Sequence, residues 1–249
     1  MPADCAVAFA DRRRLPLERL ASLLSSRERA EVSTYTCLDR RWRTITSRLL
    51  TKYLLAEPGA QQFQEVGARE IDAVGRRALA SIEHLSGVAG ARTTPAIIQE
   101  GHDCSSVSAS SSHCGPYTAS CLGGHSVGLD LERIEEHRRE FYEHAFSSEE
   151  QEWARWMGAA GGGSPEAAFT FLWTVKEAFL KASRRHDVSV WSFPHWTVRA
   201  GESVRQILRP NAPKELLKVS VGMRGPGFSA VFELASMRIN DMILCGMQY

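Results

Sequence analysis

The chain has 249 residues, of which 43% are hydrophobic, and its 30 basic and 29 acidic residues leave a net charge of +1. This composition predicts a folded protein with a sizeable core, and the balanced charge excludes an overall field that would attract nucleic acid or a membrane surface. We find no signal peptide, no transmembrane stretch and no CxxC spacing among the six cysteines. We therefore expect a cytoplasmic protein with reduced thiols.

The first half of the chain predicts mainly helices. Residues 5–10 predict a short strand, after which composition and apolar spacing predict four helices, at residues 15–24, 26–32, 39–56 and 61–85. Gly67 and Gly75 weaken the last of these predictions. Residues 86–112 are rich in Gly, Ser and Thr and predict a long loop.

The second half alternates between strands and helices. Residues 117–122 and 126–134 predict strands joined by a hairpin-like turn at Gly123–Gly124. Ser147 and Glu150 form a capping-box pattern that starts a helix at residues 148–157, and a glycine-rich connector leads into a second helix at 166–183. Four further strands are expected at residues 196–199, 216–222, 228–234 and 242–245. Helices packed on antiparallel strands give an α+β fold.

Acidic side chains alternate with apolar ones in residues 127–132. Val127, Leu129 and Leu131 alternate with Gly128, Asp130 and Glu132, as in a half-buried strand. Asp130 and Glu132 should therefore project from the same face.

The helix predicted at 166–183 is apolar on almost every side. Its polar positions Thr170, Thr174, Glu177 and Lys181 are spaced four, three and four residues apart, so they form one narrow stripe. A buried helix with one polar stripe must turn that stripe toward something polar, and we interpret its partner as a metal-bound phosphate site.

Three carboxylates, from Asp130, Glu132 and Glu177, suit Mg²⁺, which takes oxygen ligands and retains water; Mn²⁺ would suit the same oxygens. Lys181 lies one turn after Glu177 and would reach a phosphate or leaving oxygen. The alternative is an exposed strand pair beside an ordinary Glu–Lys helix pair.

Three ordered motifs resemble those of the 4'-phosphopantetheinyl transferases, in particular the larger single-chain type that activates peptide and polyketide synthases. They are Gly128-Leu129-Asp130-Leu131-Glu132, Phe146-Ser147-Ser148-Glu149-Glu150 and Trp173-Thr174-Val175-Lys176-Glu177-Ala178-Phe179-Leu180-Lys181. Upstream, Ser112-His113-Cys114-Gly115 is similar to the family's Ser-His-Ser-Gly turn, and Arg43-Thr44 resembles a further coenzyme-contacting pair.

The resemblance implies a pseudo-twofold pair of similar α+β halves, each with an antiparallel sheet packed against a long helix. We place the boundary at residue 124, with the coenzyme A 3'-phosphate and adenine side in residues 1–124 and the metal and catalytic motifs in residues 125–249. Coenzyme A would lie between the halves. The product would be a carrier protein bearing 4'-phosphopantetheine, with release of 3',5'-ADP.

The resemblance also implies the role of each site residue. Glu177 and Lys181 would be catalytic, and Asp130, Glu132 and Glu177 would hold Mg²⁺. Coenzyme A would be bound by Arg43, Thr44, Ser112, His113, Asp130, Lys176 and Lys181. The partner would be an apo acyl or peptidyl carrier protein. Such proteins are often acidic, so Arg40, Arg41 or Arg48 would help to steer them. The enzyme would act as a monomer, without nucleic acid or membrane.

The sequence departs from the family pattern in two places. Gly101-His102-Asp103 stands where a Gly-Lys-Pro turn is expected, and Glu28 and Glu31 replace basic residues near the start of the coenzyme site. Two other functions are therefore kept as alternatives: a catalytically silent protein that binds coenzyme A or a carrier protein, and a metal-dependent phosphohydrolase.

Overall fold

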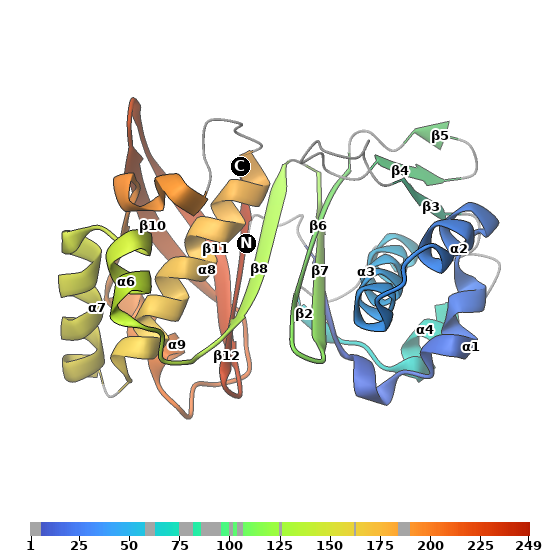
Figure 1. The fold of residues 1–249 in the computed structure, drawn as a ribbon, viewed down its shortest axis with the longest axis horizontal. Coiled ribbons are helices and arrows are strands. Elements are labelled where there is room, and N and C mark those ends of the chain that lie inside the picture. The colour runs from blue at the N-terminus through green and yellow to red at the C-terminus, as the bar shows by residue number, and fades with distance from the viewer. Residues whose placement is uncertain are drawn as a thin grey trace. The chain divides into compact units, whose positions relative to one another are not determined.

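The computed structural model describes residues 6–57, 63–74, 82–85, 96–99, 102–103, 107–124, 126–161, 163–183 and 190–249. The chain divides between Val127 and Gly128 into two compact units, the N-terminal unit and the C-terminal unit, each with its own hydrophobic core. Both units combine helices with sheets, which confirms the α+β class (Figure 1). No helix within the described ranges is long and apolar enough to cross a membrane.

The N-terminal unit packs a 19-residue helix, α3 (Leu38–Ala56), against a four-stranded sheet in the order β2-β1-β7-β6. Its remaining elements are β1 (Ala6–Asp11), α1 (Leu17–Leu20), α2 (Ser26–Ser33), β2 (Phe63–Glu65), α4 (Ala68–Val74), β3 (Ile82–Leu85), β4 (Ala96–Gln99), β5 (His102–Asp103), β6 (Ser108–Cys114) and β7 (Tyr117–Gly123). The sheet is mixed, because β1 runs parallel to β2 and antiparallel to β7. The expected antiparallel pairing therefore holds for β1–β7 and β6–β7, and only the edge strand β2 departs from it.

Two predictions in the N-terminal unit are wrong. Residues 61–85 contain strand β2, the seven-residue helix α4 and strand β3 instead of one helix. Residues 86–112 contain β4, β5 and the start of β6, where a loop was expected. The serine-rich composition of β6 is compatible with a strand because its hydroxyls find partners: Ser111 Oγ lies 2.7 Å from Ser120 Oγ on β7.

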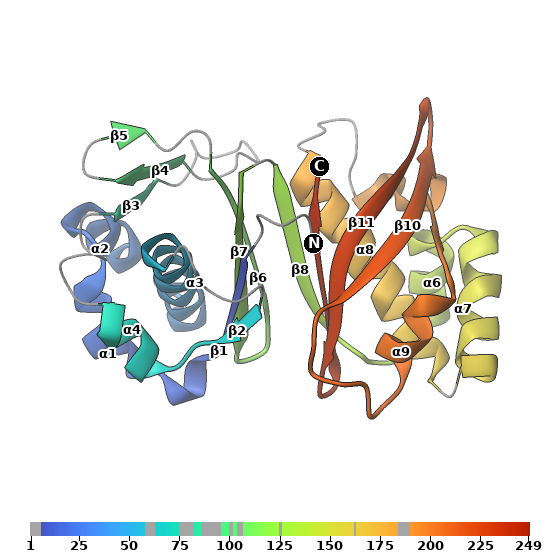
Figure 2. The same cartoon turned by 180° about the vertical axis from the view of Figure 1, so that it is seen from behind.

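The C-terminal unit packs a second 19-residue helix, α8 (Pro165–Ser183), against a five-stranded sheet in the order β8-β12-β11-β10-β9 (Figures 1 and 2). The other elements are β8 (Val127–Arg133), α6 (Arg139–Ala145), α7 (Ser148–Gly161), β9 (Thr197–Ala200), α9 (Arg205–Leu208), β10 (Leu217–Gly225), β11 (Phe228–Ile239) and β12 (Met242–Gln248). The pairs β9–β10, β10–β11 and β11–β12 are antiparallel, as expected.

Strands β7 and β8 do not form the predicted hairpin. β7 pairs with β1 and β6, whereas β8 belongs to the other sheet and neighbours β12. The physical reason is the burial of β8, in which the five residues from Val127 to Leu131 are all buried. A strand buried on both faces needs cover on both faces, which an exposed hairpin does not offer.

A buried ion pair at the start of α7 joins three elements of the C-terminal unit, α7, α8 and β9. The predicted capping box is confirmed: Ser147 N–H donates to Glu150 Oε2 at 2.8 Å, and Glu150 N–H donates to Ser147 Oγ at 3.3 Å. Glu150 Oε2 also accepts from Lys176 Nζ of α8 at 2.7 Å, and Glu150 Oε1 accepts from Val198 N–H of β9 at 2.8 Å. Both charged side chains are fully buried.

The N-terminal unit contains the same arrangement. Ser25 and Glu28 form a capping box at the start of α2, and the Glu28 carboxylate pairs at 2.8 Å with Lys52 of α3, with both side chains again buried. Each unit therefore fastens the start of a shorter helix to its 19-residue helix through a capping glutamate and a buried lysine.

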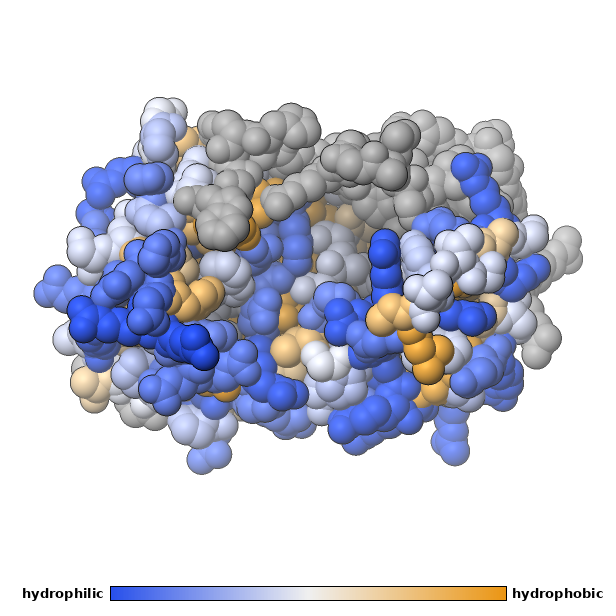
Figure 3. Space-filling view, viewed as in Figure 1, coloured by the Kyte–Doolittle hydropathy of each residue, from blue (hydrophilic) through white to orange (hydrophobic). Residues whose placement is uncertain are grey.

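The surface of the described residues is mainly polar on the face shown in Figure 3, with hydrophobic residues scattered among charged ones. Within the described residues, Cys37 is exposed and Cys245 is buried, and neither forms a disulfide.

Candidate active site

A glycine allows helix α8 to lie directly on strand β8. A Cβ atom at Gly128 would lie 1.9 Å from the carbonyl oxygen of Ala178 and 2.6 Å from the backbone nitrogen of Ala182, so no other residue fits without moving the helix. This close approach brings the polar stripe of α8 next to the acidic positions of β8.

The first contact across this junction is an ion pair. Lys181 Nζ donates to Asp130 Oδ1 at 2.7 Å and to the carbonyl oxygen of Leu129 at 3.0 Å. The Asp130 side chain is only 3% exposed, and that of Lys181 is 30% exposed. The lysine ammonium therefore offsets a carboxylate that would otherwise be buried without a counter-charge.

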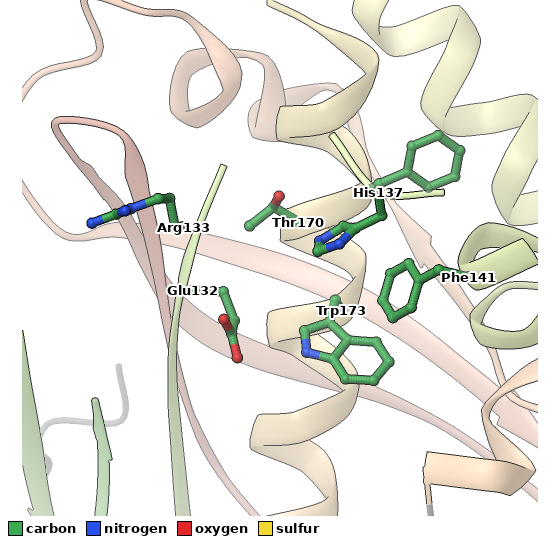
Figure 4. Close-up of a pocket in the computed structure, with 7 residues that line it drawn as sticks. Glu132, Arg133, His137, Phe141, Thr170 and Trp173 are labelled. Atoms are coloured by element: carbon green, nitrogen blue, oxygen red, sulfur yellow. The ribbon is translucent and has the colours of Figure 1, made fainter. Parts of the chain in front are cut away.

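Glu132 lies two residues further along β8 and lines a pocket of about 150 Å³. Figure 4 shows the Glu132 carboxylate on the side of the Trp173 indole. Thr170 lies on the same helix as Trp173, and His137 and Phe141 lie across the pocket. The rings of His137 and Phe141 lie 4.4 Å apart. Aromatic side chains thus form one wall of the pocket beside the carboxylate.

The surroundings of Glu132 raise its pKa to about 7. Burial is the main cause, and the negative charges of Asp130 and Glu177 act in the same direction. The Lys181 ammonium and a hydrogen bond with the Trp173 side chain lower the pKa of Glu132, but their effect is smaller than that of burial and the two negative charges. Glu132, Asp130, Glu177 and Lys181 therefore act on one another electrostatically.

The chemistry of these donors fits a divalent cation. Three carboxylates and one ammonium leave two negative charges when all are ionised, and hard oxygen donors are what Mg²⁺ takes. Within the described ranges, no three His, Cys, Asp or Glu side chains already stand together as a metal-binding group. Mutual repulsion opposes their convergence, and the Lys181 ammonium lies against Asp130.

Lys176 was expected to contact a phosphate, and the structure places its side chain inside the C-terminal unit. Its side chain is fully buried, and Nζ donates to Glu150 Oε2, to the carbonyl oxygen of Ala145 at 3.0 Å and to that of Phe193 at 2.9 Å. An ammonium has three hydrogens, so these contacts use its full donor capacity. Lys176 stabilises the fold of the C-terminal unit.

In the N-terminal unit, the structure brings together two of the residues expected at the coenzyme site. Arg43 Nη1 of α3 lies 3.1 Å from His113 Nε2 of β6, and the His113 side chain is exposed. Arginine cannot accept a hydrogen bond, so His113 Nε2 is the acceptor in this contact. Ser112 precedes His113 on β6, whereas Thr44 Oγ1 donates to the carbonyl oxygen of Arg40 in its own helix.

The two departures at Glu28 and Glu31 have a structural explanation. Glu28 pairs with the buried Lys52, and Glu31 pairs at 2.7 Å with Arg48, whose side chain is 1% exposed. These acids neutralise basic residues of α3 inside the unit. Arg48 is therefore not available at the surface to steer an acidic partner, whereas the side chain of Arg40 is exposed.

Trp173 is a site residue that sequence reasoning missed, because we counted it among the apolar residues of the helix. The spacing of Trp173 in the sequence predicts its position: it lies three residues after Thr170 and four before Glu177, so it belongs to the same face of α8.

Comparison with known proteins finds a similarity in the C-terminal part of the chain. Residues 126–222 match the 4'-phosphopantetheinyl transferase superfamily, which confirms the resemblance at the level of the superfamily. The chain is also similar to 4'-phosphopantetheinyl transferase gsp of Aneurinibacillus migulanus, with 32% identity over 71 residues. This alignment covers 28% of the chain and spans 29% of the length of that relative.

Proposed function

We propose, from the match of residues 126–222 to the 4'-phosphopantetheinyl transferase superfamily, that this protein transfers the 4'-phosphopantetheine arm of coenzyme A to a serine of a carrier protein. The observation that supports this most strongly is the junction of β8 and α8. It sets Asp130 and Glu132 against Lys181 within the stretch that matches the superfamily.

The reaction would form one bond and break one bond at phosphorus. The serine hydroxyl of the carrier protein attacks the β-phosphate of coenzyme A, and the bond from that phosphorus to the bridging oxygen breaks. The products are the phosphopantetheinyl serine and 3',5'-ADP. No covalent intermediate with the enzyme is needed.

Glu177 is the proposed base, directly or through water, for the serine proton. It lies one turn before Lys181 on α8, is partly exposed, and is close enough to raise the pKa of Glu132. Lys181 would stabilise negative charge on the bridging and leaving oxygens, for which its ammonium leaves Asp130 or is shared with it.

Asp130, Glu132 and Glu177 would hold Mg²⁺, or Mn²⁺, on the pyrophosphate. When bound, the cation supplies positive charge to the phosphate oxygens. The burial of Asp130 and the aromatic wall beside Glu132 keep both carboxylates oriented while the substrate enters. Trp173 supports this set by its hydrogen bond with Glu132.

The N-terminal unit would bind the other end of coenzyme A. Arg43 and His113 offer a guanidinium and an imidazole in contact with each other, and Ser112 and Thr44 lie next to them in the sequence. These donors suit a phosphate monoester, so we assign them to the 3'-phosphate. Lys176 is left out of the proposed coenzyme site because it is buried.

The decisive test is intact-mass spectrometry of an apo acyl carrier protein incubated with this protein, coenzyme A and Mg²⁺, and of an apo peptidyl carrier protein treated in the same way. We expect the acceptor to gain one phosphopantetheine arm. Glu177→Gln and Asp130→Asn should lose this activity, and Glu166→Gln, in the first turn of the same helix, should retain it.

The outcomes separate the proposed function from its alternatives. Coenzyme A cleaved without an acceptor would indicate a phosphohydrolase. Binding of coenzyme A or a carrier protein without modification of either acceptor would indicate a silent binding protein. If Glu177→Gln and Asp130→Asn transfer the arm at the wild-type rate, the proposed site is wrong.

A further inference from the structure

Arg12 is placed to hold the turn that follows Ser112 and His113. It lies just after β1, and its side chain is only 10% exposed. Its Nε donates to the carbonyl oxygen of Pro116 at 3.2 Å, and its Nη2 donates to that of Gly115. Gly115 has a φ of 53°, a conformation that favours glycine, so the turn is tight at this point. One guanidinium thus fixes two successive carbonyl groups of the turn.

The remaining guanidinium nitrogen of Arg12, Nη1, contacts helix α3. Arg12 Nη1 donates to Asp39 Oδ1 at 2.9 Å, and Asp39 Oδ2 lies 2.5 Å from Arg43 Nη2. Arg43 in turn contacts His113 through Nη1. These four side chains form a continuous chain of contacts that joins the end of β1, the first turns of α3 and the turn between β6 and β7.

Asp39 is charged in this arrangement. Burial acts to raise the pKa of its carboxyl group, but the hydrogen bond and charge of Arg12 and the charge of Arg43 hold it below its usual value. A carboxylate beside an anion site has two opposing effects: its charge repels the anion, and its hydrogen bonds orient the cations. The Asp39 side chain is 48% exposed, so solvent screens its charge, whereas its hydrogen bond from Arg12 and its ion pair with Arg43 act at short range through fixed geometry.

We propose that Arg12 and Asp39 are positioning residues that hold Arg43 and the His113 turn in the arrangement that selects coenzyme A with its 3'-phosphate over 3'-dephospho-coenzyme A. This inference rests on the proposed function, because it assigns Arg43 and His113 to that phosphate. Neither Arg12 nor Asp39 touches the substrate in this arrangement; they act through Arg43 and the turn.

The test compares kcat/KM for coenzyme A and for 3'-dephospho-coenzyme A, with the modified carrier protein as the readout for both. The wild type should prefer coenzyme A, and Asp39→Asn should reduce this preference about tenfold, through KM. Arg12→Lys keeps the charge but has a single donor atom, which cannot span the separate acceptors on Pro116, Gly115 and Asp39, so it should reduce the preference in the same way. General damage to the fold would lower both rates together and leave the preference unchanged.

A matched control is available in the same unit. Asp72 is 47% exposed and pairs at 2.7 Å with Arg19, so Asp72→Asn removes an equivalent surface ion pair away from the turn. The preference for coenzyme A should remain at the wild-type value in this variant. An unchanged or increased preference in Asp39→Asn would overturn the inference, and an increase would mean that Asp39 competes with the phosphate.

Calorimetric binding of the two coenzymes to the same variants distinguishes this inference from the proposed function. If the wild type transfers the arm but does not discriminate, the function stands and the inference is wrong. If no transfer occurs but the wild type binds coenzyme A more tightly and Asp39→Asn loses that preference, the inference stands and the function is wrong. Binding of neither coenzyme overturns both.

Discussion

Lys181 Nζ lies 2.7 Å from Asp130 Oδ1, at the point where helix α8 rests on strand β8. Asp130 is nearly fully buried, so the ammonium stabilises a charge that water cannot reach. A metal ion bound by the same carboxylate would take over this role and release the lysine for a phosphate. The ion pair therefore links the stability of the C-terminal unit to the state of the proposed site.

Replacement of Lys181 by alanine tests whether this ion pair connects the stability of the C-terminal unit to metal binding at the proposed site. We expect Lys181→Ala to lower the free energy of unfolding by about 1–3 kcal/mol, because a buried carboxylate loses its partner. Mg²⁺ should raise the melting temperature of this variant more than that of the wild type, since the cation no longer competes with the ammonium. Differential scanning calorimetry with Mg²⁺ and with EDTA measures both effects. Lys218→Ala, at an exposed position of β10, is the control, and equal Mg²⁺ shifts in all three proteins would contradict the prediction.

The raised pKa of Glu132 predicts a pH-dependent stability. The folded protein binds this proton more tightly than the unfolded chain, so the contribution of Glu132 to stability falls as the pH rises from about 4.5 to about 7. In EDTA at pH 8, Glu132→Gln should therefore be more stable than the wild type, by at most about 2 kcal/mol after allowance for solvent screening. The difference should shrink toward zero near pH 4.5.

Urea unfolding across this pH range tests the sign directly. Glu135→Gln alters an exposed carboxylate just beyond β8 and should show no such trend relative to the wild type. A Glu132→Gln variant that is less stable than the wild type at pH 8 without metal would show that Glu132 is not destabilised by ionisation.

The buried pair of Lys176 and Glu150 predicts a structural phenotype. Lys176→Met should lower the free energy of unfolding by about 3–5 kcal/mol, because the buried Glu150 carboxyl group, whose pKa burial already raises, loses its counter-ion. The double variant Lys176→Met/Glu150→Gln should recover part of this loss, since the amide oxygen still accepts a backbone hydrogen bond. If Lys176 has no contact with coenzyme A, the KM for coenzyme A of the double variant should stay within about twofold of the wild type. A large rise in KM in a well-folded double variant would restore Lys176 to the coenzyme site.

Trp173 predicts an indirect effect on metal binding. Trp173→Phe removes the hydrogen bond from Glu132, so the pKa of Glu132 should rise further and Mg²⁺ affinity at pH 7 should fall by about tenfold. The loss should diminish at higher pH, where Glu132 is ionised in both proteins. Isothermal titration with Mg²⁺ at two pH values measures this, with Trp153→Phe in α7 as the control. An affinity loss that is the same at both pH values would point to altered packing instead.

Much of the C-terminal unit could be predicted because its signals are local. The polar stripe of α8, the capping box at Ser147 and the strands after residue 196 follow from spacing and composition alone. The N-terminal unit was harder to predict. The short elements between residues 61 and 114 carry weak periodicity, and the serines of β6 indicate a loop unless their hydroxyls find partners across the sheet.

The sequence by itself determined which residue types stand on β8 and α8, and hence that two acids and a Glu–Lys pair would face polar surroundings. Only the tertiary structure decided what each of them meets. Gly128 allows α8 to approach β8, which pairs Lys181 with Asp130, and the fold encloses Lys176 next to Glu150, although both lysines lie in the same motif. Helical spacing defines a face of a helix, but burial depends on packing against distant segments, which short-range sequence patterns do not encode.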